Sequence, residues 1–136
     1  MLDMYWGRWL AREGRVQNIG IDIIEIARIE QVIAHWGEYF LHRVYTSAEL
    51  SLYHKKVSSL AARFAGKEAV IKALGARDYG IGWRDIEILS NSSGKPLVCL
   101  HGKAQSQADS LGLGGFGISL SHSKDYAIAF VVGEAG

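Results

Sequence analysis

The pattern that most constrains the fold is a long helical one, SSLAARFAGKEAVIKALG at positions 58–75. Serine is a favoured residue at a helix start, and glycine is favoured just after a helix end. The large apolar residues recur at the spacing of one helix face, at Leu60, Phe64, Ile71 and Leu74. The sequence therefore predicts a helix that begins at Ser58 or Ser59, ends at Gly75 and packs closely through its alanines.

Three charged residues, Lys67, Glu68 and Lys72, lie in the second half of this helix. Glu68 and Lys72 are four residues apart, a spacing that supports a solvated helix surface by about 0.2–0.5 kcal/mol. They also continue the row of Ala61 and Ala65, whose small side chains would let another part of the molecule approach. The residues alone leave two interpretations open: a solvated ion pair, or charges that face a cleft.

A nearly continuous apolar run, NIGIDIIEI at 18–26, predicts a buried strand. Because side chains alternate along a strand, Ile19, Ile21 and Ile23 share one face and Asp22 lies on the other. An unpaired carboxylate in such a strand is costly. Asp22 is therefore either a structural ion-pair or turn-capping residue, or a group that faces an open cleft.

The remaining elements follow from local signals. Thr46 and Glu49 have the spacing of a capping box, which predicts a short helix through about Lys55. Before this helix, an apolar stripe at helical spacing predicts another helix, which ends at Gly37. The stripe consists of Ile26, Ile29, Ile33 and Trp36. Strands are predicted at 83–89, 97–100, 116–123 and 126–133, with a turn at 91–96 and a helix at 103–112. The fold class is α+β, with an antiparallel sheet and packed helices.

The polar residues of this pattern suit a phosphate site. Two carboxylates without histidine or cysteine at metal-binding spacing favour a hard cation such as Mg²⁺. Magnesium held by few carboxylates completes its shell with water and phosphate, whose charge a nearby lysine neutralises. His122, which follows Ser121 near a predicted strand end, is either an exposed turn residue or part of the site.

Composition excludes several classes of protein. The 136 residues suit one domain, and a net charge of +1 argues against a general nucleic-acid binder. Cys99 is the only cysteine, which excludes an intrachain disulfide and favours the cytoplasm. No apolar run has the length of about 20 residues that a membrane-spanning helix needs, and the first 15 residues lack the apolar core of a signal peptide.

Five segments occur in a familiar order. They are GIDIIEIARI (20–29), VYTSAEL (44–50), RFAGKEAVIKALG (63–75), GKP (94–96) and SLSHSKDYAIA (119–129). The set resembles the holo-[acyl-carrier-protein] synthases, the short bacterial type of 4'-phosphopantetheinyl transferase, over about residues 16–133. The resemblance implies that family's fold and a single domain at 16–136. Residues 1–15 would then be an extension, either a start-site artefact or a packed segment.

The resemblance also implies roles for individual residues. Asp22 and Glu68 match the family's magnesium ligands, and Lys72 matches a contact to the coenzyme A phosphates. Lys67 would either bind a coenzyme A phosphate or support the helix. The other positions that match the coenzyme A site are Gly94, Lys95, Pro96, Ser121 and His122.

The implied reaction moves 4'-phosphopantetheine from coenzyme A to a serine of acyl carrier protein, for fatty acid biosynthesis, and releases adenosine 3',5'-bisphosphate. Glu68, directly or through water, is the candidate base, and Lys72 is the second catalytic candidate. Arg28 and Arg43 would dock the acidic carrier, with Lys55, Lys56 and Arg63 extending this patch. The family implies a homotrimer with sites between subunits. The alternative is a non-catalytic module that binds coenzyme A or nucleotide, or a trimeric assembly module.

Overall fold

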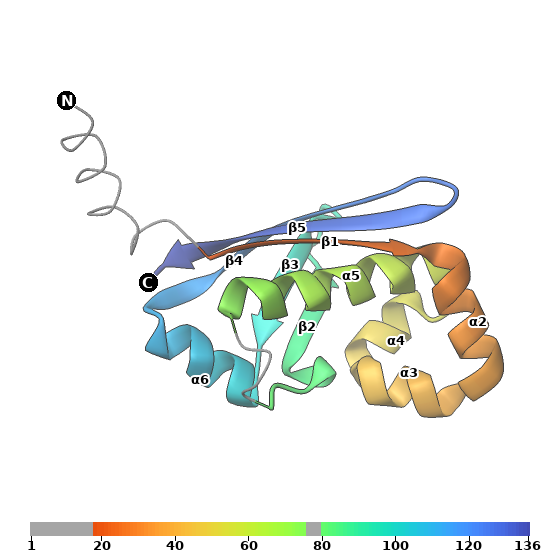
Figure 1. Cartoon of the computed structure of the whole chain (residues 1–136), viewed down its shortest axis with the longest axis horizontal. Helices are drawn as coiled ribbons and strands as arrows, with labels where there is room; N and C mark the ends of the chain where they lie inside the picture. The colour runs from red at the N-terminus through yellow and green to blue at the C-terminus, as the bar shows by residue number, and fades with distance from the viewer. Residues whose placement is uncertain (1–17, 76–79) are drawn as a thin grey trace.

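The computed structural model describes residues 18–75 and 80–136, so the predicted extension at 1–15 lies outside the described residues (Figure 1). The helices are α2 (Ile26–Trp36), α3 (Glu38–Val44), α4 (Ser47–Tyr53), α5 (Val57–Leu74), the 3₁₀ turn η1 (Trp83–Asp85) and α6 (Gly102–Ser110). The strands are β1 (Ile19–Glu25), β2 (Ile86–Ser90), β3 (Pro96–Leu100), β4 (Leu113–His122) and β5 (Tyr126–Ala135). None of the helices in these two ranges is long and apolar enough to cross a membrane.

Two antiparallel sheets and the helices around them make this an α+β fold, as predicted. The larger sheet has the order β1-β5-β4, and β2 pairs with β3 in the smaller one. Helix α5 runs along the inner face of the larger sheet, with α2, α3 and α4 near one end of it and α6 near the other (Figure 1). The first described strand therefore pairs with the last one, with Asp22 opposite Ala129.

Small side chains let α5 lie close to the sheet. Ala69 on α5 and Ala129 on β5 are fully buried in the same apolar cluster. Gly20 on β1 comes so near to α5 that a Cβ atom there would lie 1.9 Å from the Ala69 carbonyl oxygen. Only glycine fits at this point, because any side chain would collide with rigid main chain.

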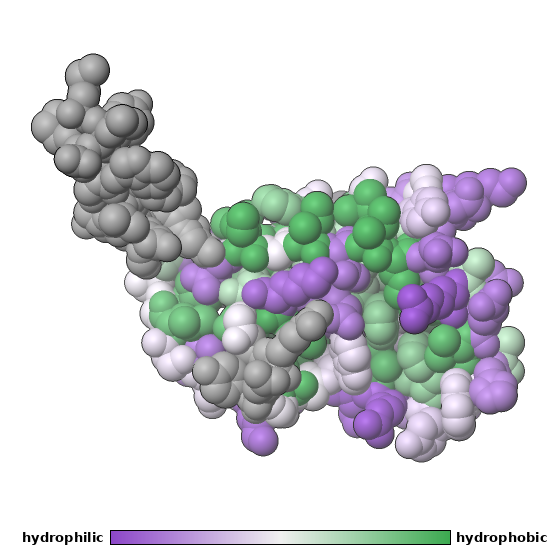
Figure 2. Space-filling model, in the orientation of Figure 1, coloured by the Kyte–Doolittle hydropathy of each residue, from purple (hydrophilic) through white to green (hydrophobic). Residues whose placement is uncertain are grey.

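The outer face of the larger sheet is apolar and exposed. Ile19, Ile21 and Ile23 keep 58%, 59% and 58% of their surface, so the prediction of a buried strand is wrong for this face of β1 in the single chain. The β5 side chains beside them are exposed as well: Tyr126, Ile128, Phe130 and Val132. We call these seven residues the apolar sheet face. Figure 2 shows its β1 part as a row of hydrophobic surface along the upper edge.

Three predicted helix boundaries are confirmed. Helix α2 ends at Trp36 with Gly37 as its C-cap, at a positive φ of 55°. The Thr46 side chain accepts a hydrogen bond from the Glu49 amide, and Glu49 accepts one from the Thr46 amide, which completes the capping box of α4. Gly75 ends α5 with a left-handed φ of 61°.

Other details differ from prediction. Helix α5 begins at Val57, with Lys56 at its N-cap and no side-chain cap, so neither predicted serine starts it. Trp36 was expected in the apolar stripe of α2 but is 57% exposed, because α2 ends there and the rings of His35 and Tyr39 cover only part of it. Residues 83–85 form a 3₁₀ turn, which shortens the predicted strand at 83–89.

Candidate active site

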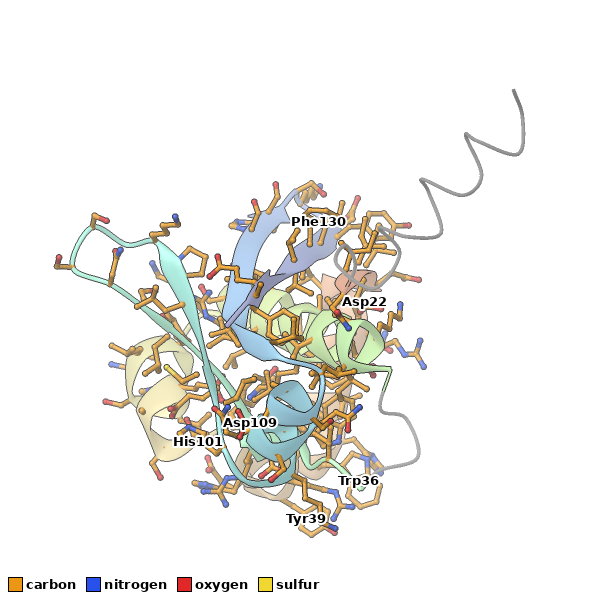
Figure 3. All side chains as sticks on the ribbon, turned by 90° about the vertical axis from the view of Figure 1, so that its left-hand side faces the viewer. Asp22, Trp36, Tyr39, His101, Asp109 and Phe130 are labelled. Carbon is orange, nitrogen blue, oxygen red and sulfur yellow. The ribbon has the colours of Figure 1, made fainter. Side chains whose placement is uncertain are left out.

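The seam between β1 and α5 brings together two of the predicted site residues. The Lys72 ammonium lies 2.9 Å from Asp22 Oδ1 and donates a second hydrogen bond, at 3.0 Å, to the Ile21 carbonyl oxygen. Figure 3 shows Asp22 beside α5. The Lys72 and Asp22 side chains are 42% and 16% exposed, so the pair borders solvent and a ligand can reach it.

Glu68 lies one helical turn before Lys72 on α5 and is half-buried. Residues four positions apart share a helix side, so Glu68 and Lys72 project from the same side of α5. This is the side where Lys72 contacts β1. A carboxylate 50 positions away in the sequence therefore holds Lys72, so its charge is engaged across the seam.

The donor atoms at this seam fit magnesium better than a transition metal. The candidate ligands, Asp22 and Glu68, offer only carboxylate oxygens, which hard cations prefer. Among the residues that the structure describes, no group of three or more His, Cys, Asp or Glu side chains could hold a metal ion. A site with two carboxylates leaves room for water and phosphate oxygens, the usual remaining ligands of Mg²⁺.

A shallow depression adjoins the seam. It is lined by Ile19, Gly20, Ile21, Lys72 and Phe130, so its floor is apolar and its charge comes from one ammonium group. An anionic ligand with an apolar part would match this lining.

The residues that match the coenzyme A site do not all lie at this seam in one chain. Ser121 and His122 are exposed at the end of β4, and β5 separates that strand from β1, a distance of about 10 Å. Gly94 and Lys95 belong to the turn between β2 and β3, and Pro96 is the first residue of β3. This end of the hairpin projects at the left of Figure 3, away from Asp22. The predicted residues thus form three separate groups on a single subunit.

Lys67, by contrast, is fully buried. Its ammonium donates to Glu49 Oε1 at 2.7 Å, and both side chains have 0% of their surface exposed. Burial lowers the pKa of Lys67, whereas the charge and hydrogen bond of Glu49 act in the opposite direction. Of the two predicted roles, this position favours support of the helix over contact with coenzyme A.

The predicted docking residues divide into exposed and buried ones. Arg28 on α2 and Arg43 on α3 are exposed and free to meet a partner. Arg63 is 9% exposed, its guanidinium lies 3.6 Å from the centre of the Tyr53 ring, and it donates to Ser90 Oγ. The prediction that Arg63 extends the surface patch is therefore wrong.

Sequence reasoning missed the wider role of Glu49. The capping-box spacing identified it as a helix-start residue, but its second oxygen also accepts a hydrogen bond from the Ile88 amide at 2.9 Å. Tyr45 is buried beside it, and burial together with the Glu49 charge raises the pKa of the Tyr45 hydroxyl. The available signal was the lysine in an alanine-rich helix, which needs a buried acid as its partner.

Comparisons with known proteins identify the family of this chain. Residues 18–131 match the profile of the 4'-phosphopantetheinyl transferase superfamily. The holo-[acyl-carrier-protein] synthase of Herpetosiphon aurantiacus is 50% identical over 121 residues, which cover 84% of this chain and 95% of that protein. The synthase of Dehalococcoides mccartyi (strain CBDB1) is 50% identical over 115 residues, which cover 85% of this chain and 96% of that protein.

The fold also matches solved structures of this kind. The structure of Helicobacter pylori holo-[acyl-carrier-protein] synthase in complex with coenzyme A superposes with a TM-score of 0.77 at 36% sequence identity. The match covers 85% of this chain and 99% of that one. The chain therefore belongs to the 4'-phosphopantetheinyl transferase superfamily and, within it, to the holo-[acyl-carrier-protein] synthases.

Proposed function

We propose that this protein transfers 4'-phosphopantetheine from coenzyme A to a serine of acyl carrier protein, as its family membership implies. The observation that carries the proposal is the contact of Lys72 with Asp22 at the seam between β1 and α5. The contact supports the proposal because an ammonium group suits phosphate and a carboxylate suits Mg²⁺, and both lie on the side of α5 that carries Glu68. The Helicobacter pylori relative, solved with coenzyme A, supports the choice of donor substrate.

In this proposal Asp22 and Glu68 hold Mg²⁺, which supplies positive charge to the phosphates when bound. Lys72 donates hydrogen bonds to the same phosphates and holds the diphosphate in position. The carrier serine oxygen forms a bond to phosphorus, and the bond from phosphorus to the adenosine 3',5'-bisphosphate oxygen breaks. Glu68, directly or through water, receives the serine proton. Positioning and charge neutralisation supply most of the rate.

We further propose that the active unit is a homotrimer. The apolar sheet face would be costly to leave in water, and an apolar patch of this kind commonly marks a protein interface. A neighbouring subunit could bring Ser121 and His122, or the turn at 94–96, to the seam of the first. The exposed residues Arg28 and Arg43 would then steer the acidic carrier to this composite site. The place of action would be the cytoplasm, in fatty acid synthesis.

A mass measurement tests the proposed activity. Apo acyl carrier protein is incubated with the protein, coenzyme A and Mg²⁺, and the carrier should gain the mass of one phosphopantetheine. Asp22→Ala and Glu68→Ala should each remove this activity in a folded protein, whereas Asp109→Ala, an exposed carboxylate on α6, should not. Coenzyme A binding without any gain in carrier mass would overturn the transferase assignment and favour a binding module.

A further inference from the structure

The pair formed by Glu49 and Lys67 satisfies every polar atom that it buries. The Lys67 ammonium donates to Glu49 and to the main-chain carbonyl oxygens of Trp83 and Ile86. Glu49 in turn accepts from the main-chain amides of Thr46 and Ile88. The pair thus joins α5 to the start of α4, to η1 and to β2 through hydrogen bonds with fixed directions.

Such a pair is poorly explained by stability alone. Well-packed apolar side chains of similar volume often stabilise a protein as well as a buried ion pair or better, because the ions lose their hydration. Loss of one partner, however, leaves an uncompensated buried charge. Directional hydrogen bonds fix the orientation of the groups that they join, whereas apolar contacts do not.

The pair lies where it can set the rotation of α5. Lys67 directly precedes Glu68, and it lies roughly 200° around the helix from Ala69, the residue that meets Gly20 on β1. The helix is therefore held on two opposite sides, by β1 on one and by the pair on the other. With side-chain ends at about 5–6 Å from the helix axis, a rotation of about 10° would move them by about 1 Å.

We propose that Glu49 and Lys67 are positioning residues that fix the rotation of α5, so that Glu68 and Lys72 face Asp22. The inference rests on the proposed function, because it assigns a task to the residues beside the site and not to the site itself. Misplacement of catalytic groups by about 1 Å can lower a rate by about 10²-fold, so the pair would act on catalysis without touching a substrate.

The test compares Lys67→Met, which keeps the length of the side chain, with the double variant Glu49→Gln/Lys67→Met, which leaves no unpaired charge. Leu74→Ala is the matched control, because Leu74 is a buried residue of the same helix outside the network. Urea unfolding measures stability, and steady-state transfer measures kcat and the KM for coenzyme A. Calorimetric titration with Mn²⁺ measures metal affinity without turnover.

For Lys67→Met we expect kcat to fall by about 10²-fold and Mn²⁺ affinity to fall as well. The double variant should recover stability relative to Lys67→Met but neither kcat nor Mn²⁺ affinity. Leu74→Ala should lose stability yet keep both within a few-fold of the wild type. If Lys67→Met does not fold, the double variant decides the question.

Two results would overturn the inference. The first is a double variant that keeps wild-type kcat and wild-type Mn²⁺ affinity. The second is a Leu74→Ala variant whose kcat and Mn²⁺ affinity fall as far as those of Lys67→Met and the double variant. Either would reduce the pair to a contribution to stability. A wild-type protein that fails to modify the carrier would instead refute the proposed function, so the two failures are distinguishable.

Discussion

The close approach of β1 to α5 predicts a large effect of a single methyl group. In Gly20→Ala the new Cβ atom would lie 1.9 Å from the Ala69 carbonyl oxygen, whereas real Cβ atoms essentially never come within 3.0 Å of another atom. Because the obstacle is helix main chain, β1 and α5 must separate by about 1 Å. Overpacking of this kind costs about 1–3 kcal/mol, or roughly 1 M in the urea unfolding midpoint.

The same displacement should reach the site, because Gly20 and Asp22 belong to one strand and Lys72 lies on the helix that is pushed away. A shift of about 1 Å between these groups should lower the transfer rate by about 10²-fold. The assay measures urea unfolding and carrier modification for Gly20→Ala and for a matched control, Gly115→Ala. The control adds the same methyl group to β4, where a Cβ atom meets nothing within 4 Å.

The control should be as stable as the wild type or more stable by about 0.4–1 kcal/mol, because alanine restricts the unfolded chain. If Gly20→Ala matched the control in both unfolding midpoint and transfer rate, β1 and α5 would have to be free to separate. Their contact would then not position the site.

Three further outcomes are expected. Lys72→Met should lower kcat/KM for coenzyme A by about 10- to 100-fold, measured by steady-state kinetics. This fold-change corresponds to the loss of a charged hydrogen bond, which contributes about 1.5–3 kcal/mol. Ile21→Lys should reduce the mass measured by light scattering to that of one chain, because it inserts a charge into the apolar sheet face. The pKa of Glu87 is lowered: burial would raise it, but hydrogen bonds from Thr46 and His101 outweigh burial. The Glu87 carboxylate therefore stabilises the folded protein above about pH 4.5, and this stabilisation is lost as the pH falls through the pKa of Glu87 in the folded state. Glu87→Gln should accordingly lose less stability than the wild type on acidification, as urea unfolding at several pH values will show.

Local signals predicted local structure well. The capping box of Thr46 and Glu49 and the end of α5 at Gly75 each depend on a few adjacent residues, so the sequence contains the whole cause. The start of α5 was missed because its first turn has no side-chain cap for a sequence pattern to reveal.

Long-range contacts could be predicted only in part. Sequence patterns gave Asp22 and Lys72 as separate unusual charges, but their contact joins residues 50 positions apart and depends on the packing of β1 against α5. The partner of Lys67 was missed for the same reason: Glu49 is 18 positions away and already had a local explanation. The residues alone showed that these charges needed partners but not which ones.

The apolar sheet face marks a different limit. Alternation along β1 correctly separated Ile19, Ile21 and Ile23 from Asp22, yet a sequence pattern does not say what covers each face. The pattern of a strand buried by its own chain is the same as that of a strand buried by another subunit. Only the structure of the folded chain could therefore reveal that these side chains are exposed.

The pairing of β1 with β5 has a consequence for synthesis. Ile23 on β1 lies opposite Ile128 on β5, so about 100 residues must leave the ribosome before β1 gains its neighbour. At about 5–20 residues per second this takes roughly 5–20 s. Throughout that interval a nascent strand rich in isoleucine has both edges unpaired, and such a segment associates readily with other chains. Timely completion of translation, or a bound chaperone, would protect the newborn chain from aggregation.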